Sequence, residues 1–328
     1  MPVSWGEDVE MCAYYKTLKE VPEEEYLARG HRLCAGCPES ICVRLVTKAA
    51  GRDTIIVNPT GCLEVSTSLF PETAWEIPWI HVAFENGGAV ASGVEAALKA
   101  LKRKGVLPKE RKTHVLVVAG DGGTTDIGFQ ALSGMLERGH DVVYVCIDNE
   151  AYMNTGIQRS GSTPYMAWAT TSPVGKVLKG KMQRKKDMVG IAAAHRIPYT
   201  ASATVGTGYW LDLMNKVRKA IDVDGPAYIH VLNPCPTGWR FEPNLTVEMG
   251  RLAVQTGMWI LYEVADGKLA VTARVSKRRP VRDYLKQQGR FRHLTEDDIA
   301  VIQRHVDESA AEMNKLVGQE VIGPVQET

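Results

Sequence analysis

Four of the seven cysteines have a spacing and neighbours that are typical of metal ligands. Cys34 and Cys37 form a Cys-X-X-Cys pair, Cys62 follows a glycine, and Cys235 precedes a proline. Zinc sites, redox dithiols and iron–sulfur clusters all use such a pair. Because Cys62 and Cys235 each follow a predicted strand, we expect them to meet the pair at one edge of a sheet. Four thiolates on separate loops favour a [4Fe–4S] cluster, and a zinc site is the alternative.

The other three cysteines are interpreted as small hydrophobic residues. Cys146 lies within an apolar run, and Cys12 and Cys42 have no paired neighbour. The chain begins with acidic residues, and no apolar run approaches the roughly 18 residues that a membrane helix needs. We therefore expect a cytoplasmic protein whose cysteines do not form disulfides.

A second group of residues predicts a phosphate and metal site. The loop Gly120–Gly123 follows an apolar run, and its glycines would let the backbone approach a phosphate beside a helix N-terminus. Asp121 within this loop would repel a diphosphate unless a divalent cation such as Mg²⁺ lay between them. Asn149 follows the next strand, with 26 residues between it and Gly122, and supplies a neutral oxygen. The alternative is a tight turn with no ligand. The loop lacks the dinucleotide-binding pattern of glycines.

The elements that must position these residues predict a doubly wound α/β fold with a mostly parallel sheet. Runs of β-branched and apolar residues predict strands that are covered on both faces, and helical periodicity appears between them. Ligands bind at the carboxyl ends of strands in such sheets. The strands are expected at 53–58, 113–119, 141–147 and 227–232, and the helices at 86–104, 126–137 and 209–221.

We divide the chain into an N-terminal arm (1–30), a main α/β domain (31–245) and a C-terminal extension (246–328). Residues 155–186 lack periodicity and predict a long functional loop. The extension is expected to hold a helix, a hairpin-like stretch at 259–274 and a charged helix at 295–317.

The overall charge argues against nucleic acid and anionic membranes as partners. Lys and Arg number 39 and Asp and Glu number 38, so the formal net charge is +1. Basic residues gather at 176–186 and 277–292, where we expect solvated or subunit-facing surfaces. Contact of the first cluster with the phosphates of coenzyme A is the alternative.

Several ordered motifs closely resemble the β subunit of pyruvate:ferredoxin oxidoreductase and related 2-oxoacid:ferredoxin oxidoreductases, which depend on thiamine diphosphate. The similarity extends from about residue 28 to 294. One departure is Pro38, where the family usually has glycine. The motifs lie at 31–37, 60–68, 81–86, 120–128, 133–140 and 148–156.

The resemblance implies a ligand set for three cofactors. The loop Gly120, Asp121, Gly122 and Gly123 would hold the diphosphate, and Mg²⁺ would bind Asp121, Asn149 and the backbone carbonyl of Ala151. Cys34, Cys37, Cys62 and Cys235 would hold the [4Fe–4S] cluster, with Cys62 beside the cofactor.

The resemblance also gives roles to two further residues. Glu39 would approach the thiamine from the cluster loop, and Asn154 would face the substrate. The alternatives are that Glu39 caps the following helix and that Asn154 only shapes its loop.

The activity implied is oxidative decarboxylation of a 2-oxoacid, with coenzyme A as acyl acceptor and ferredoxin as electron acceptor. Pyruvate is the expected substrate, and branched-chain, aromatic, dicarboxylic or oxalate-like acids are alternatives. The implied partners are an α subunit with the pyrimidine-binding domain, a γ subunit and a ferredoxin-like δ subunit, so the chain alone should be inactive. Two other interpretations are a zinc-stabilised scaffold subunit without activity and a non-redox thiamine enzyme, which would leave the four loop cysteines without a role.

Overall fold

A computed structural model describes residues 14–69 and 71–326, and Cys12 with the first part of the expected N-terminal arm lies outside them. The described residues form an eight-stranded sheet in the order β2-β1-β3-β4-β6-β5-β7-β8, in which β7 and β8 are antiparallel to their neighbours and the other strands are parallel. The predicted α/β class with a mostly parallel sheet is confirmed. The strands are β1 (Thr54–Pro59), β2 (Trp79–Val82), β3 (His114–Gly120), β4 (Val143–Asp148), β5 (Tyr199–Thr204), β6 (Ala227–Leu232), β7 (Tyr262–Ala265) and β8 (Lys268–Val271).

The sequence pattern locates β1, β3, β4 and β6 to within two residues and misses β2 and β5. Strand β2 has only four residues and lies at the edge of the sheet, where one short partly exposed strand gives little periodicity. Strand β5 is buried along its whole length, but it is made of threonine, serine and alanine beside one tyrosine. Two of its hydroxyl groups are satisfied inside the protein, because Ser202 donates to the Ile260 carbonyl at 2.7 Å and Thr204 to the Leu232 carbonyl at 3.2 Å, whereas the buried hydroxyl of Thr200 has no partner among the described residues.

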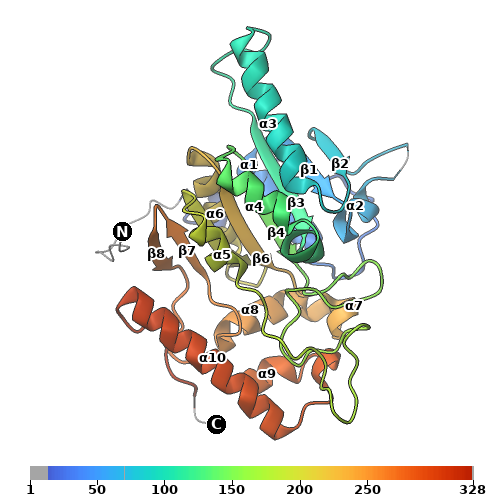
Figure 1. The fold of residues 1–328 in the computed structure, drawn as a ribbon, viewed down its shortest axis with the longest axis vertical. Helices are drawn as coiled ribbons and strands as arrows, with labels where there is room; N and C mark the ends of the chain where they lie inside the picture. Colours follow the sequence, from blue (N-terminus) through green and yellow to red (C-terminus); the bar gives the residue numbers. More distant parts are fainter. Residues whose placement is uncertain (1–13, 70, 327–328) are drawn as a thin grey trace.

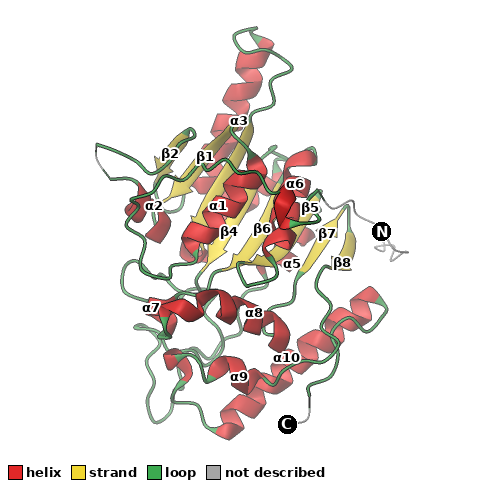
Figure 2. Ribbon diagram, turned by 180° about the vertical axis from the view of Figure 1, so that it is seen from behind, coloured by secondary structure: helices red, strands yellow, loops and turns green. Residues whose placement is uncertain are grey.

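Helices cover both faces of the sheet (Figures 1 and 2). Helices α1 and α6 pack together over one face, and α3, α4 and α5 cover the other, so each face has its own apolar core. The helices are α1 (Glu39–Ala50), α2 (Cys62–Thr67), α3 (Gly87–Arg103), α4 (Phe129–Glu137), α5 (Met188–Ala194), α6 (Trp210–Asp222), α7 (Pro236–Trp239), α8 (Thr246–Thr256), α9 (Val281–Leu285) and α10 (Glu296–Val317).

The C-terminal helices lie below the carboxyl edge of the parallel strands, beside the long loop that follows β4 (Figure 1). A third apolar core joins this loop to helices α7 to α10, with Met166, Trp239 and Tyr284 among its members. The predicted hairpin is the pair β7–β8, which extends the main sheet through β5. The predicted C-terminal helix is α10, which begins after Thr295 with a reciprocal cap between Thr295 and Asp298.

The segment after β3 differs from the expected start of a regular helix. Residues Gly122–Asp126 form one turn of π-helix, and α4 begins only at Phe129. Such wide turns are often found at functional sites because they displace the backbone locally. The loop 155–186 contains only isolated bridges and no helix or strand, as predicted. Among the described residues, no helix combines the length and the apolar character that a membrane span requires.

Candidate functional site

Asp121 lies at the end of β3 with its carboxylate buried inside the protein. Its side chain is 1% exposed, the Ser160 hydroxyl donates to Oδ2, and Oδ1 has no hydrogen-bond partner. Burial, reinforced by the Asp148 carboxylate, raises the pKa of Asp121 well above its ordinary value. A buried carboxylate with one free oxygen is the environment that a bound cation would stabilise.

Asn149 lies beside this carboxylate because β3 and β4 are neighbouring parallel strands, as the sequence predicted. Its Nδ2 donates to Glu39 Oε1 at 3.3 Å, which leaves Oδ1 of Asn149 and Oε2 of Glu39 without partners. Burial raises the pKa of Glu39 to about 7, and the hydrogen bond from Asn149 opposes the rise. Three buried oxygens from three elements therefore lack a hydrogen-bond partner. Groups of this kind are rare in proteins and require an explanation.

These three residues line one cavity of about 150 Å³ at the carboxyl edge of the sheet. Oxygen atoms from two acidic side chains and an amide are the ligands that hard divalent cations prefer. Most of the other predicted cofactor-binding residues line the same cavity, namely Cys62, Gly120, Gly122, Ala151 and Asn154. Gly123 does not line it and packs instead against the Phe84 carbonyl.

Within the loop Gly120–Gly123, Gly122 is the glycine that leaves the least room for a side chain. A Cβ atom there would meet the Tyr152 ring at 2.6 Å, so the loop and the ring could not approach as they do. At Gly120 an added Cβ would have no protein atom within 4 Å. The two glycines of one loop therefore differ: the first faces open space and the second faces an aromatic ring.

The four cysteines that were singled out as ligands lie on loops around Glu39. Burial raises the pKa of the Cys37 thiol, and the charges of Glu39, Cys235 and Cys62 add to the rise, which requires these groups to be neighbours. Cys34 is exposed and the other three are partly exposed. The described part of the chain nevertheless contains no group of three His, Cys, Asp or Glu side chains positioned to hold a metal ion.

One cysteine contact connects this region with the cavity, and a second is local to Cys235. Burial raises the pKa of Cys62, and a hydrogen bond with the Asn154 side chain opposes the rise, so Asn154 faces the cysteine loop. The backbone N–H of Gly238 donates to Cys235 Sγ at 3.4 Å. Cys42 and Cys146 are fully buried, as expected for small hydrophobic residues.

A buried network of charges beside Asn149 was missed in the sequence. Lys185 lies 2.5 Å from Asp148 and 2.8 Å from Glu150, and Arg290 lies 2.6 Å from the other oxygen of Glu150. His230 bonds the Asp148 carboxylate at 2.7 Å. Although burial opposes ionisation, the Lys185 and His230 contacts hold the pKa of Asp148 below its ordinary value.

The expectation that both basic clusters form solvated or subunit-facing surfaces is therefore wrong for several of their members, which are buried within the chain. The buried members are Lys181, Arg278 and Arg290. The ammonium group of Lys185 forms ion pairs with the carboxylates of Asp148 and Glu150. A buried cation is tolerated when carboxylates or carbonyls from distant segments surround it, and local charge patterns do not reveal such partners. The signal available in the sequence was the set of lysines at 176–186, which stands at the end of the long loop that begins shortly after Glu150.

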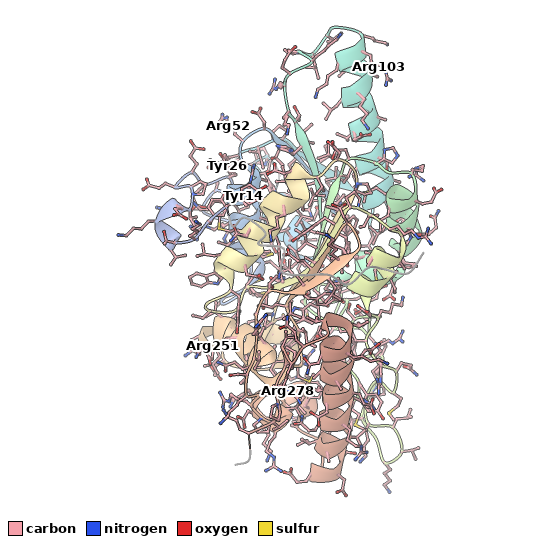
Figure 3. All side chains as sticks on the ribbon, turned by 90° about the vertical axis from the view of Figure 1, so that its left-hand side faces the viewer. Tyr14, Tyr26, Arg52, Arg103, Arg251 and Arg278 are labelled. Atoms are coloured by element: carbon pink, nitrogen blue, oxygen red, sulfur yellow. The ribbon has the colours of Figure 1, made fainter. Side chains whose placement is uncertain are left out.

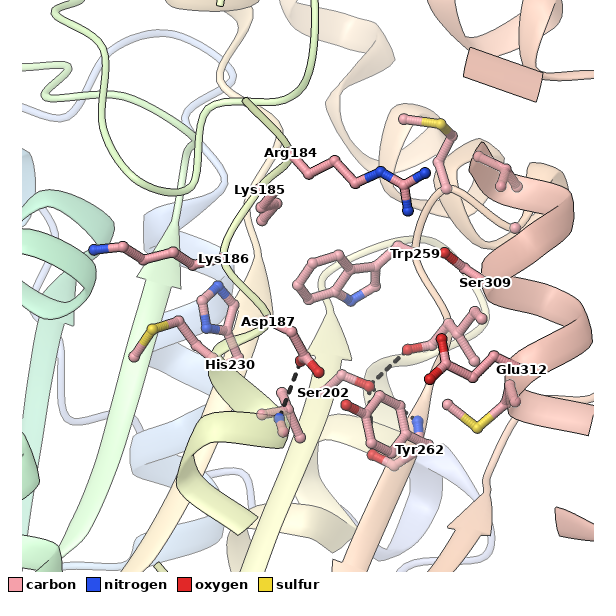
Figure 4. A pocket seen from close by; sticks show the side chains of 18 of the residues that line it. Arg184, Lys185, Lys186, Asp187, Ser202, His230, Trp259, Tyr262, Ser309 and Glu312 are labelled. Atoms are coloured by element: carbon pink, nitrogen blue, oxygen red, sulfur yellow. Dashed lines mark hydrogen bonds between the residues drawn. The ribbon is translucent and has the colours of Figure 1, made fainter. Parts of the chain in front are cut away.

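A second cavity, of about 650 Å³, is lined by residues of α10, α5 and the strands β5 and β7 and by none of Glu39, Asp121 and Asn149 (Figure 4). Its walls are mainly apolar, with Trp259 and Tyr262 among them, and Lys185 and His230 line one end. Glu150 of the charge network also lines this cavity, whereas Asp121, Asn149 and Glu39 line the smaller one.

Comparison with known proteins identifies the domain and the family. Residues 59–231 match the family described as thiamine pyrophosphate enzyme, C-terminal TPP binding domain. The chain is 56% identical over 299 residues to pyruvate synthase subunit PorB of Methanocaldococcus jannaschii, covering 91% of this chain and 98% of that protein. It is 47% identical over 305 residues to ketoisovalerate oxidoreductase subunit VorB of Pyrococcus abyssi, covering 92% and 96%.

A solved structure also shares the fold. The 2-oxoglutarate:ferredoxin oxidoreductase of Magnetococcus marinus, with 2-oxoglutarate, coenzyme A and succinyl-CoA bound, matches with a TM-score of 0.53 and 18% identity, covering 72% of this chain and 83% of that chain. At this identity the match speaks for the fold alone. The sequence matches, the thiamine pyrophosphate-binding domain and the mostly parallel sheet together place this chain in the PorB family, the β subunits of 2-oxoacid:ferredoxin oxidoreductases.

Proposed function

We propose that this chain is the subunit of a pyruvate synthase that binds thiamine diphosphate through Mg²⁺ and carries a [4Fe–4S] cluster. The reaction is the reversible oxidative decarboxylation of pyruvate with coenzyme A to acetyl-coenzyme A, CO₂ and reduced ferredoxin. The observation that carries the proposal is the set of three unpartnered buried oxygens, from Glu39, Asp121 and Asn149, around one cavity.

The chain's residues fit the metal and the diphosphate. Asp121 and Asn149 would bind Mg²⁺ through their free oxygens, with the carbonyl of Ala151 as a third ligand, and no described residue donates a hydrogen bond to that carbonyl. Gly120 would admit the diphosphate because nothing in the protein occupies the space that its missing side chain leaves. Thiamine diphosphate, when bound, supplies the carbanion chemistry that releases CO₂ from a 2-oxoacid.

Glu39 and Asn154 are proposed to act at the reacting end of the cavity. Glu39 already uses one oxygen to hold Asn149 and has its second oxygen free, so it would both orient a metal ligand and face the thiamine. Asn154 lines the cavity together with Cys62 and hydrogen-bonds it, so it would face the substrate on the side toward the cluster.

Cys34, Cys37, Cys62 and Cys235 are proposed to hold the cluster. A [4Fe–4S] cluster offers one iron to each thiolate, so its ligands need not converge on one point as zinc ligands must. The shared electrostatic environment of these thiols and their position beside Glu39 support an electron exit next to the thiamine.

The proposal includes partners and a cellular setting. An α subunit would supply the pyrimidine-binding domain and the glutamate that activates the aminopyrimidine, with γ and ferredoxin-like δ subunits, ferredoxin and coenzyme A completing the reaction in the cytoplasm. Within the chain, residues 31–245 would bind the cofactors and 246–328 would face other subunits.

The alternative substrate is a branched-chain 2-oxoacid, which the 47% identity to a ketoisovalerate oxidoreductase subunit favours. The test is a purified complex that contains this chain with its partner subunits, assayed for iron, zinc, Mg²⁺ and thiamine diphosphate, and then for dye reduction with a panel of 2-oxoacids. Pyruvate as the best substrate is expected, together with four irons per copy of this chain beyond those that the ferredoxin-like subunit holds. Zinc in place of iron, or a complex that reduces no dye with any 2-oxoacid, would reject the proposal.

A further inference from the structure

The backbone that carries Asn149 and Ala151 is held at several points, and two of them lie outside the matched domain. Glu150, between these residues, has a positive φ of 65°. A non-glycine residue adopts this conformation only when its surroundings enforce it. Residues that enforce it therefore determine whether the two proposed metal ligands point into the cavity.

Local contacts account for part of this restraint. The backbone N–H of Glu150 donates to Asp148 Oδ1 at 2.8 Å, and the Thr163 hydroxyl donates to the Glu150 carbonyl at 2.7 Å. These bonds fix the backbone of Glu150, but they do not fix its side chain or the carbonyl of Asn149. Both of those groups are held by residues beyond position 231.

Arg290 holds the Glu150 side chain. Its guanidinium donates to Glu150 Oε2 at 2.6 Å, and its Nε donates to Gln288 Oε1 at 2.8 Å, so the planar group has a fixed orientation. Lys185 occupies the other oxygen of the carboxylate at 2.8 Å. Arg290 and Glu150 are 3% and 5% exposed, so this pair is protected from solvent screening.

The same guanidinium also positions the residue that holds Asn149. Arg290 lies over the ring of Trp239, 3.8 Å from its centroid, and the indole Nε1 donates to the Asn149 carbonyl at 2.8 Å. Trp239 is 1% exposed and lies four residues after Cys235. One arginine thus reaches the loop at two successive residues, once directly and once through the tryptophan.

We infer that Arg290 is a positioning residue for the metal-binding loop, acting on Glu150 directly and on Asn149 through Trp239. The inference rests on the proposed function, because it assigns a role to residues that would face Mg²⁺ and the diphosphate. Without Arg290 the loop would populate its binding conformation less often, so the apparent dissociation constant would rise in inverse proportion to that fraction. The role predicts weaker binding of the metal and cofactor with little change in turnover once they are saturating.

The experiment measures binding of thiamine diphosphate by equilibrium dialysis against the complete complex, at fixed Mg²⁺ and then across a Mg²⁺ series. Three variants remove different contacts: Arg290→Met removes both, Glu150→Gln weakens the ion pair, and Trp239→Phe keeps a stacked ring but loses the donor to Asn149. We expect the dissociation constant to rise about tenfold for Arg290→Met and less for the other two. Arg290→Lys, which keeps the charge, should restore part of the affinity.

A matched control is Arg278→Met. Arg278, labelled in Figure 3, is also a buried arginine of the C-terminal region. It bonds the Gly323 carbonyl at 2.7 Å and Asp307 at 2.8 Å, neither of which belongs to the loop. We expect this variant to lower the thermal unfolding temperature of the complex without changing cofactor affinity. In the combined Glu150→Gln and Arg290→Met variant, the loss should be smaller than the product of the two single losses, because both changes break one pair.

The outcomes separate this inference from the proposed function. If Asp121→Ala binds Mg²⁺ and thiamine diphosphate as the wild type does, the proposed function fails. If Asp121→Ala loses binding while Glu150→Gln, Trp239→Phe and Arg290→Met keep wild-type affinity, the positioning role alone is overturned. An affinity loss in Arg278→Met equal to that in Arg290→Met would also overturn it. Should Arg290→Met yield no folded complex, Glu150→Gln and Trp239→Phe decide.

Discussion

Replacing Asp121 by asparagine tests the proposed metal site most directly, because the change removes the charge and keeps the shape. In the protein without cofactor, Asp121 is a buried carboxylate with one unpartnered oxygen. An unsatisfied buried polar group costs about 1–3 kcal/mol. The asparagine variant keeps an acceptor for Ser160 and carries no charge, so without cofactor it should be at least as stable as the wild type.

The order of stability should reverse when Mg²⁺ and thiamine diphosphate are added. A ligand present at a hundred times its dissociation constant stabilises the folded protein by about 2.7 kcal/mol. If the loss of the carboxylate weakens binding a hundredfold, the same concentration stabilises the variant by only about 0.4 kcal/mol. At this concentration the free energy of unfolding should therefore rise by about 2 kcal/mol more in the wild type than in the variant. The reason is that the cation compensates a charge that the variant lacks.

The assay is thermal unfolding of the whole complex with and without cofactor, with equilibrium dialysis to measure affinity. Asp126→Asn is the control, because Asp126 bonds the Gly161 N–H and Lys186 and does not line the cavity. It should keep the cofactor affinity of the wild type. An Asp121→Asn complex that binds the cofactor within about threefold of the wild type would refute the assignment of Asp121 as a metal ligand.

Three further predictions address the cysteines, the glycine loop and a buried lysine. Cys235→Ser should lose iron and visible absorbance, because oxygen is a poor substitute for thiolate at iron. Cys146→Ser, in the core of β4, should keep its iron. The reverse pattern would contradict the cluster assignment. Gly120→Ala should leave the unfolding temperature unchanged, because its Cβ meets no protein atom within 4 Å, but it should weaken thiamine diphosphate binding. In Gly122→Ala the new Cβ would meet Tyr152, so both the unfolding temperature and the affinity for thiamine diphosphate should fall. Burial lowers the pKa of Lys181 to about 8, so the unfolded chain binds more protons above pH 7 and stability conferred by this site rises with pH. Between pH 7 and 9 the free energy of unfolding in urea should rise by about 1 kcal/mol more for the wild type than for Lys181→Met. A difference in unfolding free energy that does not change with pH would contradict the shifted pKa.

Several features of the site were predictable because they depend on local sequence and on a general property of parallel sheets. The apolar runs at β3 and β4 determine two buried strands, and the residues after them, Asp121 and Asn149, must lie at the same edge. The glycines of the loop and the Cys-X-X-Cys pair are likewise visible as short motifs. The polar strand β5 and the edge strand β2 escaped prediction, since their burial and pairing come from neighbouring elements.

The sequence by itself thus determined the fold class, the family motifs and the strand ends where ligands gather. Only the tertiary structure decided how the proposed metal-binding loop is held. Glu150 is paired with Lys185, 35 residues away, and with Arg290, 140 residues away. Such pairs follow no local spacing, because burial makes them favourable only after the loop 155–186 and the C-terminal helices have closed over the carboxyl edge of the sheet. Once water is excluded there, the buried charges of the two basic clusters need carboxylates or carbonyls as partners. This requirement connects the C-terminal region, through Arg290, to Glu150 in the loop after β4.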